Sequence, residues 1–308
     1  MMQNEPAVED RYVLVNGVRL HYLDWGGAGD PLLFLPGNGE PASALRWFAK
    51  RFFPQFRPLA LTRRGMGKSD IPEGSYIIDQ LVEDIRGFLD AVDIQKVSLV
   101  GHSLGGAEAS LFAANYPHRV RKLVNLDGCF IDKELFELRK EDPLAVPDHC
   151  SAPKEALETV DAYLAYVRRT EPYVDRLWSP AMREMWIVDL RIGESGAIEE
   201  IDRSHAMSEP IQSLQEKRLD FSQIAVPMLA IAAIETQYPD VPPDASSDVK
   251  RKANDYQARL VETKRRIVER IKREKPDARI LELLGAAHHC YITHEETTYA
   301  HVLEFLAE

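Results

Sequence analysis

One serine stands in a pattern that is typical of a catalytic nucleophile. Ser103 lies between Gly101 and Gly105 in the stretch LVGHSLGG, directly after a run of apolar residues. Glycines at these two positions allow a sharp turn from a strand into a helix, which a Cβ atom would obstruct. Such a turn presents the serine hydroxyl outward, where a neighbouring base can take its proton. The spacing therefore predicts nucleophilic catalysis at Ser103.

A serine that attacks a carbonyl group also needs N–H donors for the oxyanion that forms. The backbone N–H of Leu104, at the start of the expected helix, is one such donor, and the helix dipole supports it. The second donor is expected in the loop LPGNGE, where Asn38 follows Gly37 after a short apolar strand. Glycines in this loop also suit an ordinary turn, so the loop indicates an oxyanion donor only in combination with Ser103.

The base must be a histidine, and the chain has nine of them. His288 and His289 lie in LLGAAHHCYITHEE, in a loop of small residues after the last expected strand. The carboxyl end of that strand should share a sheet edge with Ser103, so we expect His288, in preference to His289, to be the base. His102 should point away from the nucleophile and pack. Two adjacent histidines can also bind a metal, but no carboxylate or cysteine completes a ligand set at a useful spacing, so we expect no metal.

The elements that must position these residues alternate between buried strands and helices. Asn16-Gly17 joins two β-rich runs and predicts a tight hairpin. Further strands are expected near residues 32–35, 57–62, 96–101, 122–126, 226–234 and 278–284, and helices near 43–52, 76–92, 105–115 and 298–306. This alternation predicts an α/β fold with a mostly parallel central sheet and helices on both faces.

The alternation stops after Gly128, and from about 131 to 219 only helical patterns follow. A helical insertion between two strands can lie as a lid over the ends of the strands. We therefore expect a core of residues 1–130 and 222–308 with an inserted helical cap of residues 131–221. Trp178 and Trp186 are expected to line the substrate route, although packing inside the cap would explain them as well.

Composition and charge exclude several classes of function. The chain has 308 residues, of which 45% are hydrophobic, enough for one large core and an inserted subdomain. Its net charge of -11 argues against a nucleic-acid-binding surface. The stretch from Val249 to Lys275 is different, because it holds eleven Lys and Arg against four Asp and Glu. We expect it to form a solvated helix with one face on the core, rather than a nucleic-acid or membrane patch.

The expected cellular compartment is inferred from three features: apolar runs, the first residues and the cysteine pattern. No apolar run approaches the roughly 20 residues of a membrane span. The first twelve residues are polar and acidic and do not resemble a signal peptide. Cys129, Cys150 and Cys290 form no C-x-x-C pattern and indicate neither a disulfide framework nor a zinc knuckle. We therefore expect a cytoplasmic protein with reduced thiols.

With these motifs in place, the chain resembles the α/β-hydrolase superfamily. The matching stretches are PLLFLPGNG, TRRGMGKSD, GHSLGG, YPHRVRKLVNLD and LLGAAHH, within residues 12–130 and 222–308. The resemblance implies that Ser103 is the nucleophile, His288 the base, and Asn38 and Leu104 the oxyanion donors. We expect no cofactor. The chain departs from the family pattern in two places: Pro36-Gly37 replaces the usual His-Gly, and no Gly-x-x-Asp follows VPMLAIAAIET.

Two carboxylates compete for the role of the acid that orients His288. Glu235 lies about one residue short of the place where most of the superfamily has its acid. Asp127 ends the strand KLVNL, from which some branches of the superfamily take theirs, although an aspartate there can simply cap a turn. The loop after Glu235, TQYPDVPPDASSD, looks irregular, whereas a strand end is a stiffer support. Asp127 is therefore our expected acid, with Glu235 as the alternative.

The resemblance and the serine together imply a serine hydrolase. The expected reaction is cleavage of an ester, thioester or lactone of a small, largely apolar substrate through an acyl-enzyme. The serine weakens an epoxide-hydrolase or dehalogenase interpretation, because those members use an aspartate at the same turn. A peptidase, a C–C bond hydrolase and a slow-turnover ligand receptor or regulatory protein remain alternatives.

Expected partners and pH dependence follow from this interpretation. The partner should be a small-molecule substrate, without nucleic acid or membrane. The rate should rise with pH through roughly 6–7 as an ordinary imidazole loses its proton.

Overall fold

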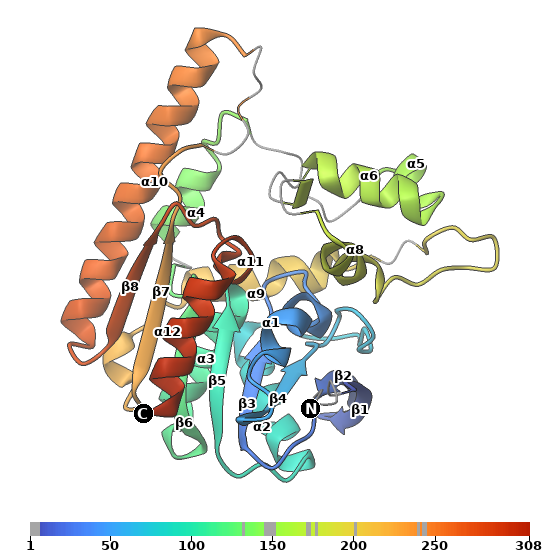
Figure 1. Cartoon of the computed structure of the whole chain (residues 1–308), viewed down its shortest axis with the longest axis vertical. Coiled ribbons are helices and arrows are strands. Elements are labelled where there is room, and N and C mark those ends of the chain that lie inside the picture. The colour runs from blue at the N-terminus through green and yellow to red at the C-terminus, as the bar shows by residue number, and fades with distance from the viewer. Residues whose placement is uncertain are drawn as a thin grey trace, which may run out of the picture.

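A computed structural model describes residues 7–130, 133–144, 152–170, 174–175, 178–199, 202–238, 241 and 245–308, and its centre is an eight-stranded sheet (Figure 1). The strands are β1 (Glu9–Val15), β2 (Val18–Asp24), β3 (Asp30–Leu35), β4 (Phe56–Leu61), β5 (Val97–His102), β6 (Val120–Leu126), β7 (Met228–Ile234) and β8 (Arg279–Leu284). Their order in the sheet is β1-β2-β4-β3-β5-β6-β7-β8. Only the β1–β2 and β2–β4 pairs are antiparallel, so the sheet is mostly parallel, as predicted.

The expected hairpin forms the first edge of the sheet. Asn16 and Gly17 both have positive φ, at 50° and 78°, which is the conformation that a two-residue hairpin turn requires. Val15 and Val18 therefore pair directly across the turn.

Helices cover both faces of the sheet. They are α1 (Arg46–Lys50) with the preceding 3-10 turn η1 (Ala42–Leu45), α2 (Ile78–Ala91), α3 (Leu104–Asn115), α10 (Ser247–Glu274), α11 (Cys290–Thr293) and α12 (Glu295–Ala307). On one face, α2, α3 and α10 bury side chains such as Phe88, Phe112 and Ile271 against the strands. On the other face, α1 and α12 bury Phe48 and Phe305. Two separate apolar cores thus hold a sheet that is buried on both sides.

Between β6 and β7, the regular secondary structure of the described residues is helical apart from one isolated bridge between Ile192 and Ile198, and loops and turns join the helices. Its helices are α4 (Lys133–Arg139), α5 (Lys154–Leu157), α6 (Val160–Thr170), α8 (Pro180–Ile187) and α9 (Ser204–Glu216). Figure 1 shows α5, α6 and α8 as a group at one end of the sheet, whereas α4 packs on α10 and α9 on α2. The two ends of the insertion therefore pack on core helices, α8 contacts η1 of the core, and α5 and α6 pack on each other.

The parallel strands end at one edge of the sheet, and the residues singled out above follow five of them. Asn38 comes after β3, Ser103 after β5, Asp127 after β6, Glu235 after β7 and His288 after β8. In open α/β sheets, ligands bind outside the carboxyl ends of the strands. The topology thus brings residues separated by up to 250 positions (38 to 288) to one edge.

Candidate active site

The turn at Ser103 has the strained backbone that its neighbouring glycines predict. Ser103 joins β5 to α3 with φ 50° and ψ -121°, a conformation that non-glycine residues rarely adopt. A Cβ atom at Gly101 would lie 2.3 Å from the Gly105 carbonyl oxygen, and one at Gly105 would lie 2.2 Å from that of Leu35. Strand, turn and helix can approach this closely only because both positions are glycine.

Three polar groups at this turn and in the loop after β3 have no hydrogen-bond partner among the described residues. Within the described part of the chain, the Ser103 hydroxyl makes no hydrogen bond, and the backbone N–H groups of Asn38 and Leu104 donate to no protein acceptor. Leu104 is the first residue of α3, where N–H groups have no intrahelical acceptor. These are the two donors that the sequence predicted for an oxyanion.

The loop that carries Asn38 is held from both sides. Arg63 donates to the carbonyl oxygens of Pro36, at 2.6 Å, and of Gly37, while its guanidinium is paired with Glu108 of α3 at 2.9 Å. On the other side, the Gly37 N–H donates to Glu40 Oε2 at 2.7 Å. Since Arg63 and Glu108 are both buried, removing either partner would cost about 3–5 kcal/mol. The loop is therefore preorganised, as a stabilising site for developing charge must be.

The Asn38 side chain connects this loop to the insertion. Its Nδ2 donates to the carbonyl oxygen of Met207 in α9 at 3.0 Å. A Cβ atom at Gly39 would lie 2.9 Å from Met207 Cε, so α9 packs closely over the loop. The candidate oxyanion loop thus contacts the segment between β6 and β7.

His288 is joined to Asp127, one of the two candidate acids. Its Nδ1 lies 2.6 Å from Asp127 Oδ2, and the Ala233 N–H donates to Asp127 Oδ1 at 2.9 Å. Burial by itself would raise the pKa of Asp127, but the ammonium of Lys264 and the His288 hydrogen bond lower it to about 2. An ionised carboxylate only accepts, so Nδ1 must carry the proton and Nε2 is the basic nitrogen.

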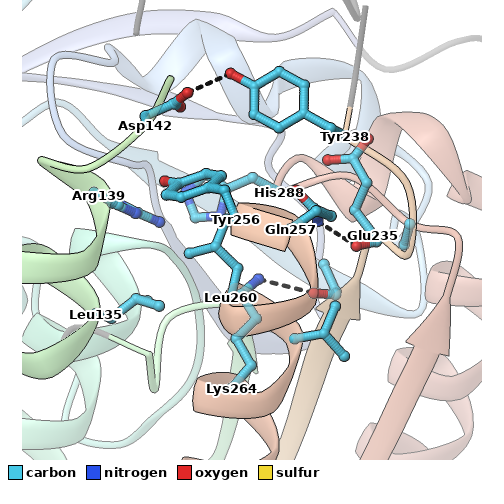
Figure 2. Close-up of a pocket in the computed structure, with 13 residues that line it drawn as sticks. Leu135, Arg139, Asp142, Glu235, Tyr238, Tyr256, Gln257, Leu260, Lys264 and His288 are labelled. Carbon is cyan, nitrogen blue, oxygen red and sulfur yellow. Dashed lines mark hydrogen bonds between the residues drawn. The ribbon is translucent and has the colours of Figure 1, made fainter. Parts of the chain in front are cut away.

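Glu235, the alternative acid, occupies a different position. Its side chain is half-buried and lines a cavity of about 170 Å³ beside His288 (Figure 2). The amide of Gln257 donates to the backbone carbonyl of Glu235. Across the cavity, the Tyr238 hydroxyl donates to Asp142 at 2.5 Å. The structure thus pairs His288 with Asp127 and places Glu235 on the wall of the cavity.

Trp178 and Trp186 do not line this cavity. Both lie at the rim of a small apolar cluster built on Val167, Val174 and Met182. Ile292, four residues after His288, packs on the same cluster. The two tryptophans are therefore close to the loop of the expected base, although they are not part of the cavity wall.

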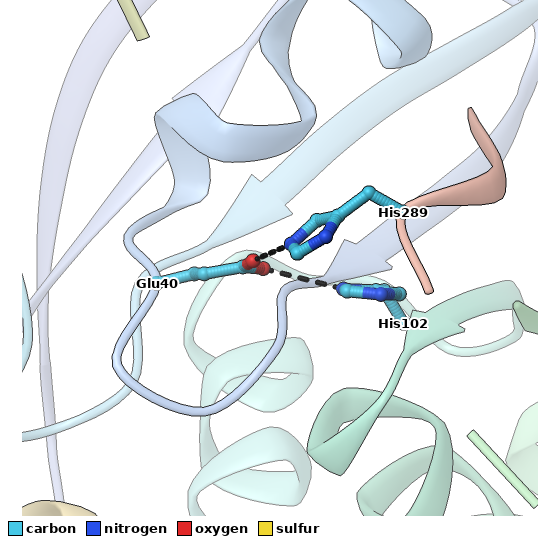
Figure 3. Close-up of side chains that lie close together, drawn as sticks. All are labelled: Glu40, His102 and His289. Atoms are coloured by element: carbon cyan, nitrogen blue, oxygen red, sulfur yellow. Dashed lines mark hydrogen bonds and ion pairs between the residues drawn. The ribbon is translucent and has the colours of Figure 1, made fainter. Parts of the chain in front are cut away.

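Glu40, His102 and His289 form a second cluster, which the sequence analysis missed (Figure 3). Glu40 Oε1 lies 2.6 Å from His289 Nε2, and Glu40 Oε2 lies 3.3 Å from His102 Nδ1. His102 Nε2 donates to the His288 carbonyl oxygen at 3.2 Å, so this buried ring packs, as expected, and also forms hydrogen bonds. Glu40 supplies the carboxylate whose absence had argued against a metal at these histidines.

The shortest distance within this cluster fits a hydrogen bond better than metal ligation. Two ligand atoms of one tetrahedral zinc ion stand roughly 3.3 Å apart, because each bond is about 2.0–2.1 Å long. The 2.6 Å between Glu40 and His289 is instead a charge-assisted hydrogen bond. Glu40 also accepts from the Gly37 N–H. The cluster therefore links the loop of Asn38 to the loop of His288.

The basic stretch forms the 28-residue helix α10. Ala253, Tyr256, Ile267 and Ile271 are buried on its inner face, in agreement with the expected helical spacing. Several of its outer cations pair with acids of the same helix or of neighbouring elements, for example Arg266 with Glu134 and Lys272 with Glu269. This part of the helix is the solvated face that the charge pattern predicted.

Two further ionisable groups near Asp127 are neutral thiols. Burial raises the pKa of Cys290 to about 12 and raises that of Cys129 further, so neither is a thiolate at neutral pH. Both are free cysteines, and Cys150 lies outside the described residues.

The surroundings of His288 predict activity that persists into mildly acidic solution. Burial, and repulsion from the His102 and His289 rings, lower the pKa of His288, while Asp127 opposes the change. A general base must be neutral, so a lowered pKa keeps it competent at lower pH, and activity is lost only as the pH falls through that value. We expect the acid limb of kcat/KM to lie below the roughly 6.5 of a free imidazole. A midpoint at or above 6.5, measured between pH 4 and 9, would contradict this and favour the ordinary range expected from the sequence.

Comparisons with known proteins agree with the fold. Residues 30–178 match the model of the alpha/beta hydrolase fold family. The chain is 37% identical over 119 residues to Epoxide hydrolase 1 of Caenorhabditis elegans, covering 38% of this chain and 30% of that protein. It is 29% identical over 204 residues to 2-hydroxy-6-oxo-2,4-heptadienoate hydrolase of Pseudomonas putida, covering 60% of this chain and 73% of that protein.

A solved structure extends the similarity to nearly the whole chain. E-2-(acetamidomethylene)succinate hydrolase superposes with a TM-score of 0.74 at 21% identity, covering 98% of this chain and 100% of that one. The chain therefore has the α/β-hydrolase fold. It spans only about a third of the length of the worm epoxide hydrolase that it matches. Among the described residues, no helix is both long and apolar enough to cross a membrane.

Proposed function

We propose that this protein is a serine hydrolase that cleaves an ester, thioester or lactone of a small substrate through an acyl-enzyme. The observation that carries the proposal is the 2.6 Å contact between His288 Nδ1 and Asp127. That contact makes the other ring nitrogen a base, on a loop at the sheet edge where Ser103 is presented. The N–H groups of Asn38 and Leu104, which donate to no acceptor among the described residues, would supply what the oxyanion needs.

The proposed reaction has two halves. In the first, His288 Nε2 takes the Ser103 proton as the hydroxyl oxygen attacks the substrate carbonyl carbon. The imidazolium then gives this proton to the leaving alcohol, thiol or enol, and the acyl group stays on Ser103. In the second half, His288 activates a water molecule, which releases the acid and restores the serine. Asp127 holds the ring in one tautomer and stabilises the imidazolium throughout.

The named relatives do not change the choice of nucleophile. One of them is an epoxide hydrolase, and members with that activity are expected to use an aspartate at the turn occupied here by Ser103. Hydrolysis of a C–C bond is a second candidate, favoured by the similarity to 2-hydroxy-6-oxo-2,4-heptadienoate hydrolase over 60% of the chain. A slow ligand receptor would have the same side chains and differ only in turnover.

A substrate panel separates these functions. Purified protein would be assayed with short and medium p-nitrophenyl esters, acyl thioesters, lactones and a vinylogous 1,5-diketone. Turnover of the acyl substrates, with a burst of first product equal to the enzyme concentration, supports the proposal. Turnover of the diketone alone would favour the C–C bond hydrolase. Saturable ligand binding with no turnover of any substrate would favour the receptor.

We also propose that the segment 131–221 is a lid over the site and that Trp178 and Trp186 border the substrate route. Changing either tryptophan to alanine is expected to alter the preference for acyl chain length, because both lie in the cluster beside Ile292. Removing such a partly buried ring also costs stability, so the two effects must be measured together. The test is kcat/KM across an ester series beside the melting temperature. Unchanged preference with a large loss of stability would mean that these residues only pack the insertion.

A further inference from the structure

One cation of the basic helix α10 does not belong to its solvated face. Lys264 is only 14% exposed, and its ammonium lies 2.8 Å from Asp127 Oδ2 and 3.0 Å from Asp127 Oδ1. The same nitrogen donates to the Ala233 carbonyl oxygen at 2.8 Å. Because a lysine ammonium has three N–H groups, these three contacts use all of them.

Asp127 is consequently shared among three donors. Oδ2 accepts from His288 at 2.6 Å and from Lys264 at 2.8 Å, while Oδ1 accepts from the Ala233 N–H and from Lys264. Ala233 thus binds both members of the ion pair, one through its N–H and the other through its carbonyl oxygen. This ring of contacts leaves the carboxylate little freedom to rotate away from His288.

We propose that Lys264 is a positioning residue of the catalytic centre: it fixes Asp127 toward His288 and offsets part of the negative charge that the imidazole experiences. The proposal rests on the proposed function, since it concerns the same histidine and acid. It also explains why the link between β7 and β8 includes a long helix, because α10 brings the ammonium to the end of β6.

The expected effect of Lys264 on His288 follows from the carboxylate of Asp127, which lies between the two side chains. A carboxylate next to a histidine stabilises the imidazolium and raises the histidine pKa by attraction. An ammonium bound to that carboxylate weakens this attraction, so His288 loses its proton more readily. Lys264 should therefore keep the base neutral at lower pH and make the imidazolium a stronger acid toward the leaving group.

Other ionisable groups face the same pair and must stay unchanged in the test. The His102 and His289 rings lie 4.7 and 5.5 Å from the His288 ring, with Glu40 beyond them. The buried thiols of Cys129 and Cys290 lie near Asp127. On the cavity side are the charged groups of Arg139, Asp142 and Glu235 and the hydroxyls of Tyr238 and Tyr256.

The experiment measures His288 directly. Histidine labelled with ¹³C in its ring would be titrated by NMR in the Ser103→Ala protein, and the His288 signal would be assigned by its loss in His288→Gln. Lys264→Met removes the ammonium at similar volume, and Lys264→Gln keeps a donor without charge. We expect either change to raise the His288 pKa by roughly one unit, the lower end of the effect of a nearby charge. Lys264→Arg, which keeps the charge, should stay close to the parent.

Lys272→Met is the matched control. Lys272 lies on the same helix and carries the same charge, but it is solvent-exposed and pairs with Glu269 at 2.6 Å. Its replacement should leave the His288 titration unchanged. In the enzyme with Ser103 intact, the acid limb of kcat/KM should move upward in Lys264→Met and Lys264→Gln by the same interval as the NMR value.

The outcomes separate the two proposals. An unchanged His288 titration in folded Lys264→Met and Lys264→Gln overturns the inference, even if Ser103 proves essential for turnover. A shift equal to that of Lys272→Met also overturns it, because it would reflect net charge alone. If neither neutral variant folds, Lys264 acts in folding and the inference is wrong. A raised pKa in a protein that hydrolyses nothing would support the inference and refute the proposed function.

Discussion

Replacing Ser103 with alanine is expected to remove at least roughly 10³-fold of the hydrolytic activity and to leave the fold intact. The hydroxyl makes no hydrogen bond within the described part of the chain, so its loss leaves no buried partner unsatisfied. Its backbone conformation, with φ 50°, is already imposed by the glycines on either side and remains available to alanine at similar cost. The measurement is kcat/KM on the best acyl substrate, together with the melting temperature.

A covalent probe tests the same residue independently. A fluorophosphonate should label the parent protein on the peptide that contains Ser103 and should not label Ser103→Ala. Ser222→Ala is the matched control, because Ser222 is an exposed serine of the short 3-10 turn Phe221–Gln223 that precedes β7. Its labelling and turnover should equal those of the parent. An adduct found by mass spectrometry on any residue other than Ser103 would refute the assignment.

The second large effect concerns Asp127. Asp127→Asn is expected to lower turnover by on the order of 10²–10⁴, because an amide can present N–H to His288 Nδ1 and favour the wrong tautomer. The substitution also removes the ion pair between Asp127 and Lys264, so the Lys264 ammonium loses this charged partner. Some loss of stability should accompany the loss of activity, so kcat must be measured well below the melting temperature of the variant.

Glu235→Gln provides the comparison. It makes the same chemical change in the other candidate acid, on the wall of the cavity beside His288. We expect turnover within a few-fold of the parent, because His288 Nδ1 is already bound by Asp127. An inactive Glu235→Gln beside a nearly normal Asp127→Asn would reverse the choice between the two acids. That result would require His288 to exchange partners in the working enzyme.

The sequence was most informative where the signal is local. The hairpin at Asn16-Gly17 and the strand-turn-helix at Ser103 are each specified within about ten residues, by glycines and by apolar periodicity. The order of strands and helices followed from the same patterns, and the structure confirms the mostly parallel sheet. Some differences lie at element ends, since α3 begins at Leu104 and α12 at Glu295, earlier than expected. In addition, the helix expected near 43–52 is a 3-10 turn followed by the short α1, and α11 was not expected.

The sequence did not reveal the groups that support the proposed catalytic residues. Arg63, Glu40 and Lys264 lie within stretches that the sequence analysis names, but nothing there assigns them a role, and each resembles an ordinary surface charge when it is considered alone. In the fold, Arg63 is buried against Glu108, 45 residues away, and Lys264 reaches Asp127 across 137 residues. Glu40 meets His289 across 249 residues. Only the burial of an ionisable group distinguishes such residues, and burial is not a property of the local sequence.

The sequence by itself thus determined the strands, the helices and the residue types that follow each strand at the functional edge. Backbone conformation at glycines and the periodicity of apolar residues depend on near neighbours, so they can be read along the chain. The tertiary structure decided which side chains meet: it paired His288 with Asp127, placed Glu235 on a cavity wall and aimed Lys264 inward. Those contacts depend on the order of strands in the sheet and on how helices pack across it, where a shift of one residue turns a side chain to the opposite face.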